Sequence, residues 1–492
     1  MDTQEGLRPA AAGRSSIDSD STDISELVIE EPPESHGGFP PRDGIEAWKF
    51  LLGCSIVEAF IWAFALSFGI FEAYFGTHPA YQSSSYISTI GTLSVGLSYL
   101  GLPPINALAL RYPHRQRQLM ILGWLLTLFS LLCASQATKV WHLVLWQGFA
   151  LGLGWVVCYA PFLIMLNGWF DKRRGLAYGI VFGASGLSGM IIPFLLEKGL
   201  REHGYEVTLQ YFVLATIIVT GPALLLIKPR VTSQKRELQQ DDTSPFLGRP
   251  HRKPQDINTD NSYYGFLHSV PALLFMLSVL LQGLAGFLPD IFIPSYSAAI
   301  SPPGNYGDLL LALRSLFQTV GQIGIGYASD VFHPLLPPFI DVAVSTVSVI
   351  GIWGPAKSTP VLALFASIWG AFAGGYSVVW FRAVALLAES RISSAERSRP
   401  EGCSPQTVTM YGWCSFLRGV AMIVGGYIGA NLLGKESDVD LEKFGLGRWD
   451  WVVRFCAIAL FASTICGGLC WKWDIVARRR RANRSAHTLD DR

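Results

Sequence analysis

The chain has 492 residues, of which 50% are hydrophobic and only 15% are charged, and its formal net charge is +1. Soluble proteins usually carry about a quarter charged residues, so this composition excludes an ordinary soluble domain. The net charge itself says little about partners, because the placement of the charges along the chain matters more than their sum.

The first 47 residues contain no apolar run of membrane length and include the acidic, Ser-rich stretch SSIDSDSTDISE. Such a composition cannot bury enough apolar surface to fold, so we expect a disordered cytoplasmic tail. We interpret its polar residues as keeping the tail solvated; a phosphorylation target is the alternative. The first apolar run begins near Trp48 and lacks a small-residue cleavage site, which argues against a removed signal peptide.

From Trp48 onward the sequence alternates between polar loops and apolar stretches of about 20 residues, which are long enough to cross a bilayer as helices. We therefore predict an all-α polytopic membrane protein with twelve transmembrane helices. Six form a bundle at 48–228 and six form a second bundle at 263–473, with a cytoplasmic linker at 229–262 and a basic cytoplasmic tail at 474–492. The predicted spans are 48–75, 84–107, 118–136, 141–166, 174–196, 208–227, 265–295, 307–330, 338–355, 360–386, 408–432 and 450–473.

Basic residues are distributed unevenly between the two sides of the membrane. They concentrate in the linker, in alternate loops and in the C-terminal tail, which contains RRRRANR at 478–484. The positive-inside rule places these segments, and hence both termini, in the cytoplasm, which requires an even number of spans. We interpret RRRRANR as a topology anchor near anionic lipid rather than a nucleic-acid site. The plasma membrane is the expected location, with the vacuolar membrane as the alternative.

An internal repeat indicates two related halves. The segments RRGLAYGIVFGASGLSG at 173–189 and LRGVAMIVGGYIGANLLG at 417–434 share Arg-Gly-apolar-Ala followed by a glycine-rich stretch. Two six-helix halves with a site between them are typical of transporters that rock around a midplane site. The Gly-x-x-Gly-x-x-Gly pattern at 183–189 does not indicate a nucleotide loop, which needs a preceding strand. Its small residues instead allow two membrane helices to approach closely.

Three segments resemble a known family: DGIEAW at 43–48, VEAFIWAFALSFGIF at 57–71 and GWFDKRRGLAYGIVFGASG at 168–186. They look like the monocarboxylate-transporter-like branch of the major facilitator superfamily, and especially its fungal members. The resemblance extends over about residues 43–473. It implies twelve helices, alternating access and a small organic solute, usually with proton coupling.

The chain departs from this branch at three positions. By the resemblance, carriers of simple monocarboxylates have a Lys where this chain has Leu66, and an Asp and an Arg where it has Gln318 and Gln322. A glutamine can hydrogen-bond a solute but supplies neither a cation nor an acid. Because positions i and i+4 share a helix face, we keep both glutamines as solute-binding candidates. Helix–helix contact is the alternative.

A single acid, Glu58, interrupts the first apolar run. It follows Trp48 by ten residues, which is about 15 Å along a helix axis and near the middle of the bilayer. An ionised carboxylate at that depth must face water, find a partner or stay protonated. The resemblance implies that the first helix lines the central cavity. We predict that Glu58 binds the coupling proton or hydrogen-bonds the solute; a buried, protonated Glu bonded to a neighbouring helix is the alternative.

Three further charges fall inside predicted spans. Asp290 and Arg314 lie toward the outer ends of consecutive antiparallel helices, so we predict an ion pair that forms either an outer gate or a static contact. Arg418, about ten residues into the eleventh span, is the candidate cation for a solute anion. If that span begins later, Arg418 is only an anchor that reaches the membrane surface.

Charged and aromatic residues complete the set of candidates. We expect the short cytoplasmic run Asp171, Lys172, Arg173 and Arg174 to set topology and to pair between helices, which favours one access state. Aromatic residues could form an apolar, stackable wall around a solute, although most aromatics in such a chain serve packing or interface belts. The aromatic candidates are Trp62, Tyr99, Trp155, Tyr159, Tyr296, Trp380 and Tyr411.

These observations predict a secondary active transporter for a small organic solute, such as a secondary metabolite or a vitamin-like compound. Two alternatives stay open. The alternatives are a monocarboxylate/proton symporter and a non-transporting nutrient sensor on the same fold. No Walker loop, metal-ligand spacing or clustered His/Asp/Ser set occurs, so we expect no enzyme activity, no cofactor and no metal. The expected partners are the solute, protons and the lipid bilayer, with no nucleic acid, and we expect a monomer.

Overall fold

The structure is a computed structural model that describes residues 40–77, 87–230, 264–301, 306–389 and 404–490. The chain divides into two compact units, residues 1–40 and 41–492, and every helix described belongs to the second. Residues 1–39 of the predicted N-terminal tail and 231–262 of the predicted linker lie outside the described residues. The division of the membrane region into two six-helix bundles stays a prediction.

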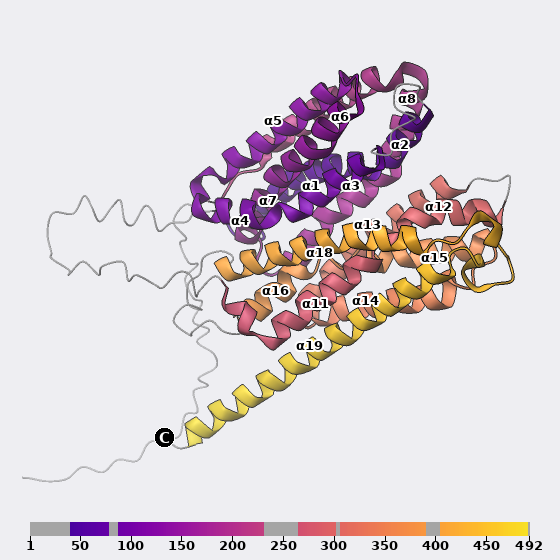
Figure 1. Cartoon of the computed structure of the whole chain (residues 1–492). Coiled ribbons are helices and arrows are strands. Elements are labelled where there is room, and N and C mark those ends of the chain that lie inside the picture. Colours follow the sequence, from indigo (N-terminus) through magenta and orange to yellow (C-terminus); the bar gives the residue numbers. More distant parts are fainter. Residues whose placement is uncertain (1–39, 78–86, 231–263, 302–305, 390–403, 491–492) are drawn as a thin grey trace, which may run out of the picture. The chain divides into compact units, whose positions relative to one another are not determined.

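The described residues form helices and no strands (Figure 1). The helices of the part before residue 231 are α1 (Ile45–Leu66), α2 (Phe68–Thr77), α3 (Ile87–Leu100), α4 (Leu102–Arg111), α5 (Gln116–Ser135), α6 (Val140–Leu143), α7 (Leu151–Trp169) and α8 (Arg174–Leu226). Those after residue 263 are α11 (Val270–Ala285), α12 (Leu288–Ile300), α13 (Gly307–Val331), α14 (Leu336–Ser348), α15 (Thr359–Ala373), α16 (Trp380–Glu389), α18 (Pro405–Leu432) and α19 (Asp450–Asp490).

Short irregular helical segments join some of these helices. Two are π-helical and continue a span, and four are single 3₁₀ turns in loops. They are η1 (Pro113–Arg115), η2 (Val144–Ala150), η3 (Gly265–His268), η4 (Val349–Trp353), η5 (Glu436–Asp438) and η6 (Phe444–Leu446).

Ten continuous helices within the described residues are long and apolar enough to cross a membrane. The 53-residue α8 covers two predicted spans, 174–196 and 208–227. The shorter α15 and α16 together cover the predicted span 360–386. Each of the twelve predicted spans therefore has a helical counterpart, which supports the predicted all-α membrane fold.

Helix α8 is a hairpin of two membrane-length helices. Gly204 interrupts it with φ 75° and ψ 176°, a conformation that essentially only glycine adopts. The indole of Trp169, just before α8, donates a 3.0 Å hydrogen bond to the carbonyl of Lys228, just after it. Both ends of α8 therefore lie together, as a pair of antiparallel spans requires.

Helix α19 differs from the prediction at its C-terminal end. The span was expected to end at residue 473, whereas α19 continues to Asp490. The segment from Lys472 onward is rich in Arg and Ala and contains neither Gly nor Pro, so local helix propensity favours continuation. Part of the predicted basic tail is thus helical.

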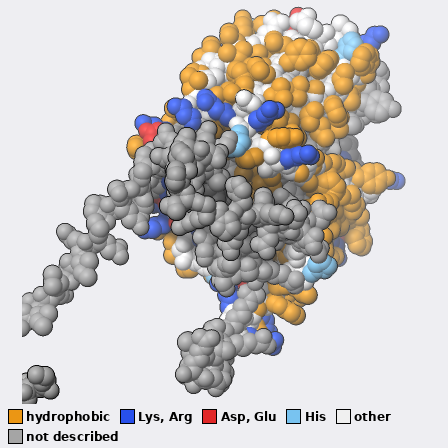
Figure 2. All heavy atoms as spheres, turned by 90° about the vertical axis from the view of Figure 1, so that its left-hand side faces the viewer, with side chains coloured by type: hydrophobic (Ala, Val, Ile, Leu, Met, Phe, Trp, Pro, Cys, Tyr) orange, Lys and Arg blue, Asp and Glu red, His pale blue; other side chains and the backbone are white. Residues whose placement is uncertain are grey.

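The outer surface matches an environment of lipid. Large apolar side chains such as Leu122, Phe129 and Leu225 are exposed on α5 and α8, and hydrophobic atoms cover much of the flanks in Figure 2. The same view, onto the end of the molecule at the left of Figure 1, shows several groups of Lys and Arg side chains among the hydrophobic ones. Because water is absent from a bilayer core, such flanks suit a membrane rather than solvent.

We expect Gly204→Ala to destabilise the protein by about 1–3 kcal/mol, because alanine must adopt a conformation suited to glycine. A lower apparent Tm of the purified protein in detergent would show this. Gly221→Ala is the matched control, since Gly221 lies within the helix and has open space where a Cβ would stand. Equal melting temperatures for the two variants would contradict the hairpin.

Candidate functional site

Glu58 lies inside the helix packing with its side chain fully buried, at 0% exposure. It follows the first residue of α1, Ile45, by about 20 Å along the helix axis. The indole Nε1 of Trp62, one turn later, donates a 2.7 Å hydrogen bond to Glu58 Oε1. The second oxygen, Oε2, has no hydrogen-bond partner among the described residues. One half of this carboxyl group is therefore available for a proton, a water molecule or a solute.

Arg418 occupies the middle of α18 rather than its end. It follows the first residue of that helix, Pro405, by about 20 Å, which does not fit a surface anchor. Its Nη1 donates a 2.6 Å hydrogen bond to Gln282 Oε1 on α11, and its Nε has no partner among the described residues. The guanidinium carbon lies 5.6 Å from the ring centre of Trp380 and 6.0 Å from that of Tyr99.

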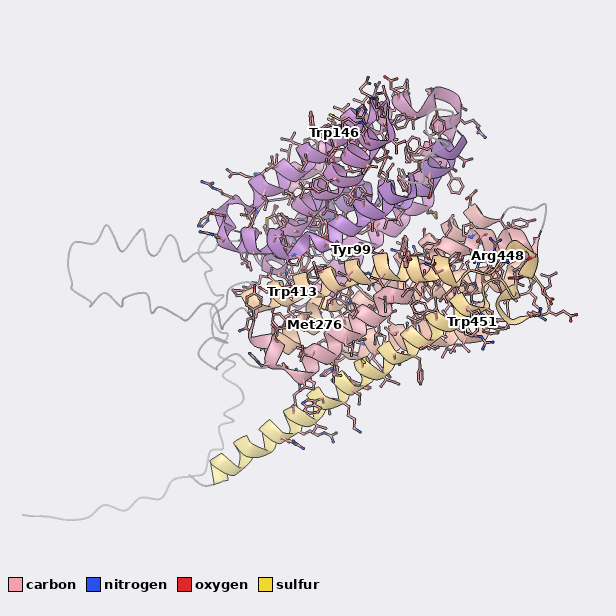
Figure 3. All side chains as sticks on the ribbon, in the orientation of Figure 1. Tyr99, Trp146, Met276, Trp413, Arg448 and Trp451 are labelled. Carbon is pink, nitrogen blue, oxygen red and sulfur yellow. The ribbon has the colours of Figure 1, made fainter. Side chains whose placement is uncertain are left out.

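Aromatic rings connect the acid to the cation. The Trp62 and Tyr99 ring centres are 5.7 Å apart, and Tyr99 lies at the boundary between α3 and α18 (Figure 3). We call Glu58, Trp62, Tyr99, Trp380 and Arg418 the central cluster. Trp62, Tyr99 and Arg418 are partly exposed, whereas Glu58 and Trp380 are buried. The cluster combines an acid, a cation and aromatic faces, which suits an organic solute with both apolar and polar parts.

The aromatic candidates divide into two groups. Tyr159 donates a 2.9 Å hydrogen bond to the carbonyl of Ser98, the residue before Tyr99, and the Tyr411 ring centre is 6.4 Å from that of Trp380. Trp155 packs edge-on against Phe64 instead, at 6.4 Å. Tyr296 packs elsewhere: its hydroxyl donates to the backbone carbonyls of Trp353, the last residue of η4, and Ala356, and its ring packs on Trp449.

Asp290 and Arg314 form the predicted ion pair. Arg314 Nη2 lies 2.7 Å from Asp290 Oδ2, with the two side chains 11% and 13% exposed. The indole of Trp369 donates a 3.2 Å hydrogen bond to the other oxygen, Oδ1. Gln318 extends the pair, because its Oε1 accepts a hydrogen bond from Arg314 Nη1. Whether the pair opens as a gate stays a prediction.

Gln322, one turn beyond Gln318, bonds to a neighbouring helix. Its Nε2 donates a 2.9 Å hydrogen bond to the carbonyl of Gly374, while its Oε1 has no partner among the described residues. Gln322 thus ties α13 to the backbone just beyond α15, whereas Gln318 bonds Arg314 of its own helix. The contact of Gln322 agrees with the helix-contact alternative, and the role of both glutamines toward a solute stays a prediction.

The charged run from Asp171 to Arg174 forms a compact loop before α8. Arg174 Nη2 lies 3.1 Å from Asp171 Oδ1. The backbone N–H groups of Asp171, Lys172 and Arg173 donate hydrogen bonds of 3.2–3.3 Å to the carboxylate of Asp43. Asp43, from the DGIEAW segment, thereby fixes the loop, a role that the sequence did not suggest.

Asp330 is a second residue that sequence reasoning missed. Its carboxylate accepts 2.8 Å hydrogen bonds from the backbone N–H groups of Gly175 and Leu176, at the N-terminus of α8, and it pairs with Arg382. An anion at a helix N-terminus is stabilised by the helix dipole and by otherwise unpaired N–H groups. A helix N-terminus such as that of α8 favours an acidic partner, and this was the available sequence signal. The sequence alone does not show that α13, which contains Asp330, packs against α8.

Asp341 is a third missed residue. It lies in the ninth predicted span, on α14, and is 1% exposed. The sequence signal was the same as for Glu58, a lone acid in an apolar run, but the run PPFIDVAVSTVS is short and rich in small polar residues.

The sequence model described as Major Facilitator Superfamily matches residues 50–395. Among curated relatives, the MFS-type transporter hasB of Aspergillus fumigatus is 26% identical over 91% of this chain and 93% of its own length. The fujikurins efflux protein of Gibberella fujikuroi is 26% identical over 70% of each chain. Monocarboxylate transporter 12 of Xenopus laevis is 26% identical over 59% of this chain and 64% of its own.

A solved structure supports the fold. A bacterial homologue of the iron transporter ferroportin, in an outward-facing state with soaked iron, aligns with a TM-score of 0.56 and 13% identity, over 86% of this chain and 98% of that one. At this identity the likeness concerns the fold alone. The resemblance noted in the sequence is confirmed by these relatives, as is the expectation of a membrane transporter rather than an enzyme.

We expect Arg314→Gln to lower stability by up to about 3 kcal/mol, because it leaves Asp290 charged and largely buried. The neutral double variant Asp290→Asn/Arg314→Gln should recover most of that loss, which a thermal unfolding series in detergent would measure. Arg454→Gln is the control, since Arg454 pairs with Asp450 at an exposed position and should cost below about 1 kcal/mol. Additive losses at Asp290 and Arg314 would contradict the pairing.

Proposed function

The chain belongs to the Major Facilitator Superfamily, and on this premise we propose that it moves a small organic solute across a membrane by alternating access. The central cluster is the proposed solute-binding site, and Glu58 is the proposed proton-binding group. The observation that carries the proposal is the placement of Glu58 and Arg418. They lie at about the same depth in α1 and α18, and each has one buried polar atom without a hydrogen-bond partner in the described parts of the chain.

The cluster's chemistry narrows the class of solute. Arg418 offers a cation whose Nε has no partner among the residues described. Tyr99 and Trp380 offer aromatic faces to it, and Trp62 packs on Tyr99. This combination favours a solute larger than lactate, with an unsaturated or apolar body and a carbonyl, enol or carboxylate group. Secondary metabolites commonly have this character, and the name of the Gibberella fujikuroi relative describes an efflux protein for fujikurins. We therefore favour export.

Simple monocarboxylate symport remains the alternative, since one relative is a monocarboxylate transporter by name. Against it stand Leu66, Gln318 and Gln322, where the resemblance places Lys, Asp and Arg. In the structure Gln318 bonds Arg314 and Gln322 bonds a backbone carbonyl. Neither amide supplies the charge that pairs with a small carboxylate. A nutrient sensor without transport is the other alternative.

Glu58 supplies the proposed link to a proton gradient. Burial without a cationic partner favours the neutral acid, and the bond from Trp62 holds one oxygen in place in either state. When the cluster opens to the more acidic side, Glu58 takes up a proton. When it opens to the less acidic side, hydration favours ionisation and the proton leaves. Solute and proton can then cross in opposite directions through one site.

Two polar contacts are suited to closing the site at opposite ends. At one end Asp330 bonds the N-terminus of α8 and pairs with Arg382, near the loop of Asp171 to Arg174. The ion pair of Asp290 and Arg314 is the proposed outer gate. From the positive-inside rule we infer that the Asp330 end and both termini are cytoplasmic. The plasma membrane is the proposed location, with the vacuolar membrane as the alternative.

We expect Glu58→Gln to remove the pH dependence of transport, because glutamine cannot exchange a proton. The solute is found by comparing small molecules inside and outside cells that produce or lack the protein, at two external pH values. Wild-type cells should show a compound enriched outside, more so in acid, and Glu58→Gln cells should lose that pH difference. Glu72→Gln, an exposed change on α2, is the matched control.

Three outcomes would contradict parts of this proposal. Enrichment of a compound inside the cells would make the protein an importer. A pH dependence unchanged in Glu58→Gln would remove Glu58 from coupling. No change in any compound would leave the sensor alternative.

A further inference from the structure

Two buried aromatic rings meet between α8 and α16. The ring centre of Tyr178 on α8 lies 5.0 Å from that of Phe381 on α16, and the two ring planes are 15° apart. The side chains are 1% and 3% exposed. Aromatic pairs with centres about 4.5–7 Å apart attract each other beyond the burial of their surface. This stack therefore joins the part of the chain before residue 231 to the part after residue 263.

The stack continues the aromatic side of the central cluster. The ring centre of Tyr411 on α18 lies 5.1 Å from that of Phe381 and 6.4 Å from that of Trp380. Trp380 belongs to the central cluster, and Tyr411 is itself buried. A row of rings therefore leads from the central cluster to Tyr178.

The far side of the stack adjoins the polar contact made by Asp330. Tyr178 follows Gly175, whose N–H group bonds Asp330, by one helical turn, or about 4.5 Å along the axis. Phe381 is directly followed by Arg382, which pairs with Asp330. The stack thus lies between the central cluster and the Asp330 end of the molecule.

The ring of Tyr178 is fixed to α7 by hydrogen bonds. Its hydroxyl donates a 2.8 Å bond to the carbonyl of Leu163 and accepts a 2.7 Å bond from Nδ2 of Asn167. Asn167 also donates a 3.1 Å bond to the Leu163 carbonyl. Tyr178 must therefore move with α7 and α8.

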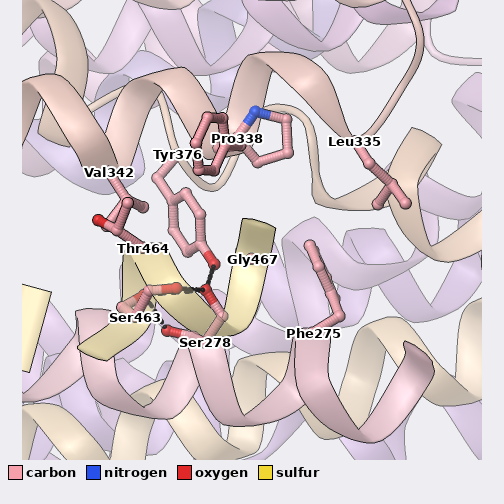
Figure 4. Close-up of a pocket in the computed structure, with 10 residues that line it drawn as sticks. Phe275, Ser278, Leu335, Pro338, Val342, Tyr376, Ser463, Thr464 and Gly467 are labelled. Carbon is pink, nitrogen blue, oxygen red and sulfur yellow. Dashed lines mark hydrogen bonds between the residues drawn. The ribbon is translucent and has the colours of Figure 1, made fainter. Parts of the chain in front are cut away.

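The other side of the stack is fixed to the helices that follow residue 263. Tyr376, just before α16, has its ring centre 5.8 Å from that of Trp380. Its Oη lies 3.0 Å from Ser278 Oγ on α11, which lies 2.8 Å from Ser463 Oγ on α19 (Figure 4). The segment that leads into α16 is thus tied to α11 and α19. Separation of α8 from α16 must therefore break the stack.

We propose that Tyr178 and Phe381 form an aromatic gate, which closes the central cluster toward the Asp330 end. The proposal rests on the transport function proposed above. Asp330 and Arg382 hold this end together by charge, whereas the two rings supply an apolar layer that excludes water, as hydrophobic constrictions do in channels. When α8 and α16 separate, the ring faces part and the central cluster opens to this end.

The test is a distance measurement between spin labels at the exposed positions Lys172 and Phe332, in the full-length protein in lipid vesicles with its native cysteines replaced. The ratio of the long to the short distance reports how often this end is open. Tyr178→Leu should raise this ratio about 2- to 12-fold, the change that corresponds to the loss of one aromatic pair. Phe381→Leu should do the same, and the double variant should add little to either single change.

Two further variants separate the stack from general effects on folding. Tyr178→Phe retains the ring and should keep the wild-type ratio, which guards against a shift caused by misfolding. Phe339→Leu is the matched control. The ring of Phe339 packs on that of Trp471 at 5.7 Å, and both residues follow residue 263, so its loss should leave the ratio unchanged.

An unchanged ratio in Tyr178→Leu, with both distances present, would overturn the gate alone. Effects of Tyr178→Leu and Phe381→Leu that multiply in the double variant would also overturn it, because the two rings would then act independently. A single short distance in every variant would overturn the gate together with the alternating access on which it rests. Failure of transport itself appears separately: a protein that shows the shift but moves no compound in the solute comparison would retain the gate.

Discussion

The close contact of α8 with α13 is the constraint on which the described arrangement depends. At Gly179 a Cβ atom would stand 2.5 Å from the carbonyl oxygen of Gln322, so the two backbones can approach only because glycine has no side chain. Asp330 then adds two hydrogen bonds to the N-terminus of α8. Packing of small residues and a charge at a helix end are two of the stronger means by which helices associate in lipid. Their combination joins segments more than 100 residues apart along the chain.

The second organising requirement is that charged groups inside the bilayer need a partner of opposite charge or a hydrogen-bonding group. Asp290 and Arg314 pair with each other, and Asp330 bonds a helix terminus and Arg382. Glu58, Asp341 and Arg418 meet it only in part. In a membrane such incomplete compensation marks functional positions, because a proton, a solute or a rearrangement must complete it. The proposed transport cycle uses Glu58 and Arg418 for that reason.

Much of the fold could be predicted because length and hydropathy decide whether a helix crosses a membrane, and the twelve predicted spans all have helical counterparts. Glu58 and Arg418 were found for the same reason, since a lone charge in an apolar run is visible in sequence. The partners were not visible. Asp330 bonds a helix N-terminus and Asp43 bonds a loop, and both contacts depend on which helices meet. The continuation of α19 beyond residue 473 was missed because the predicted end followed the fall in hydropathy, whereas helix propensity stays high there.

Distances across the Asp330 end would test the proposed alternating access most directly. Spin labels at the exposed positions Lys172 and Phe332 of the purified protein, with its native cysteines replaced, report whether the loop before α8 leaves α13. Alternating access predicts two distance populations in lipid vesicles, with the longer one increased by Asp330→Asn, which weakens the contact with α8. A single short distance in both proteins, at acidic and at neutral pH alike, would contradict a site that opens at this end.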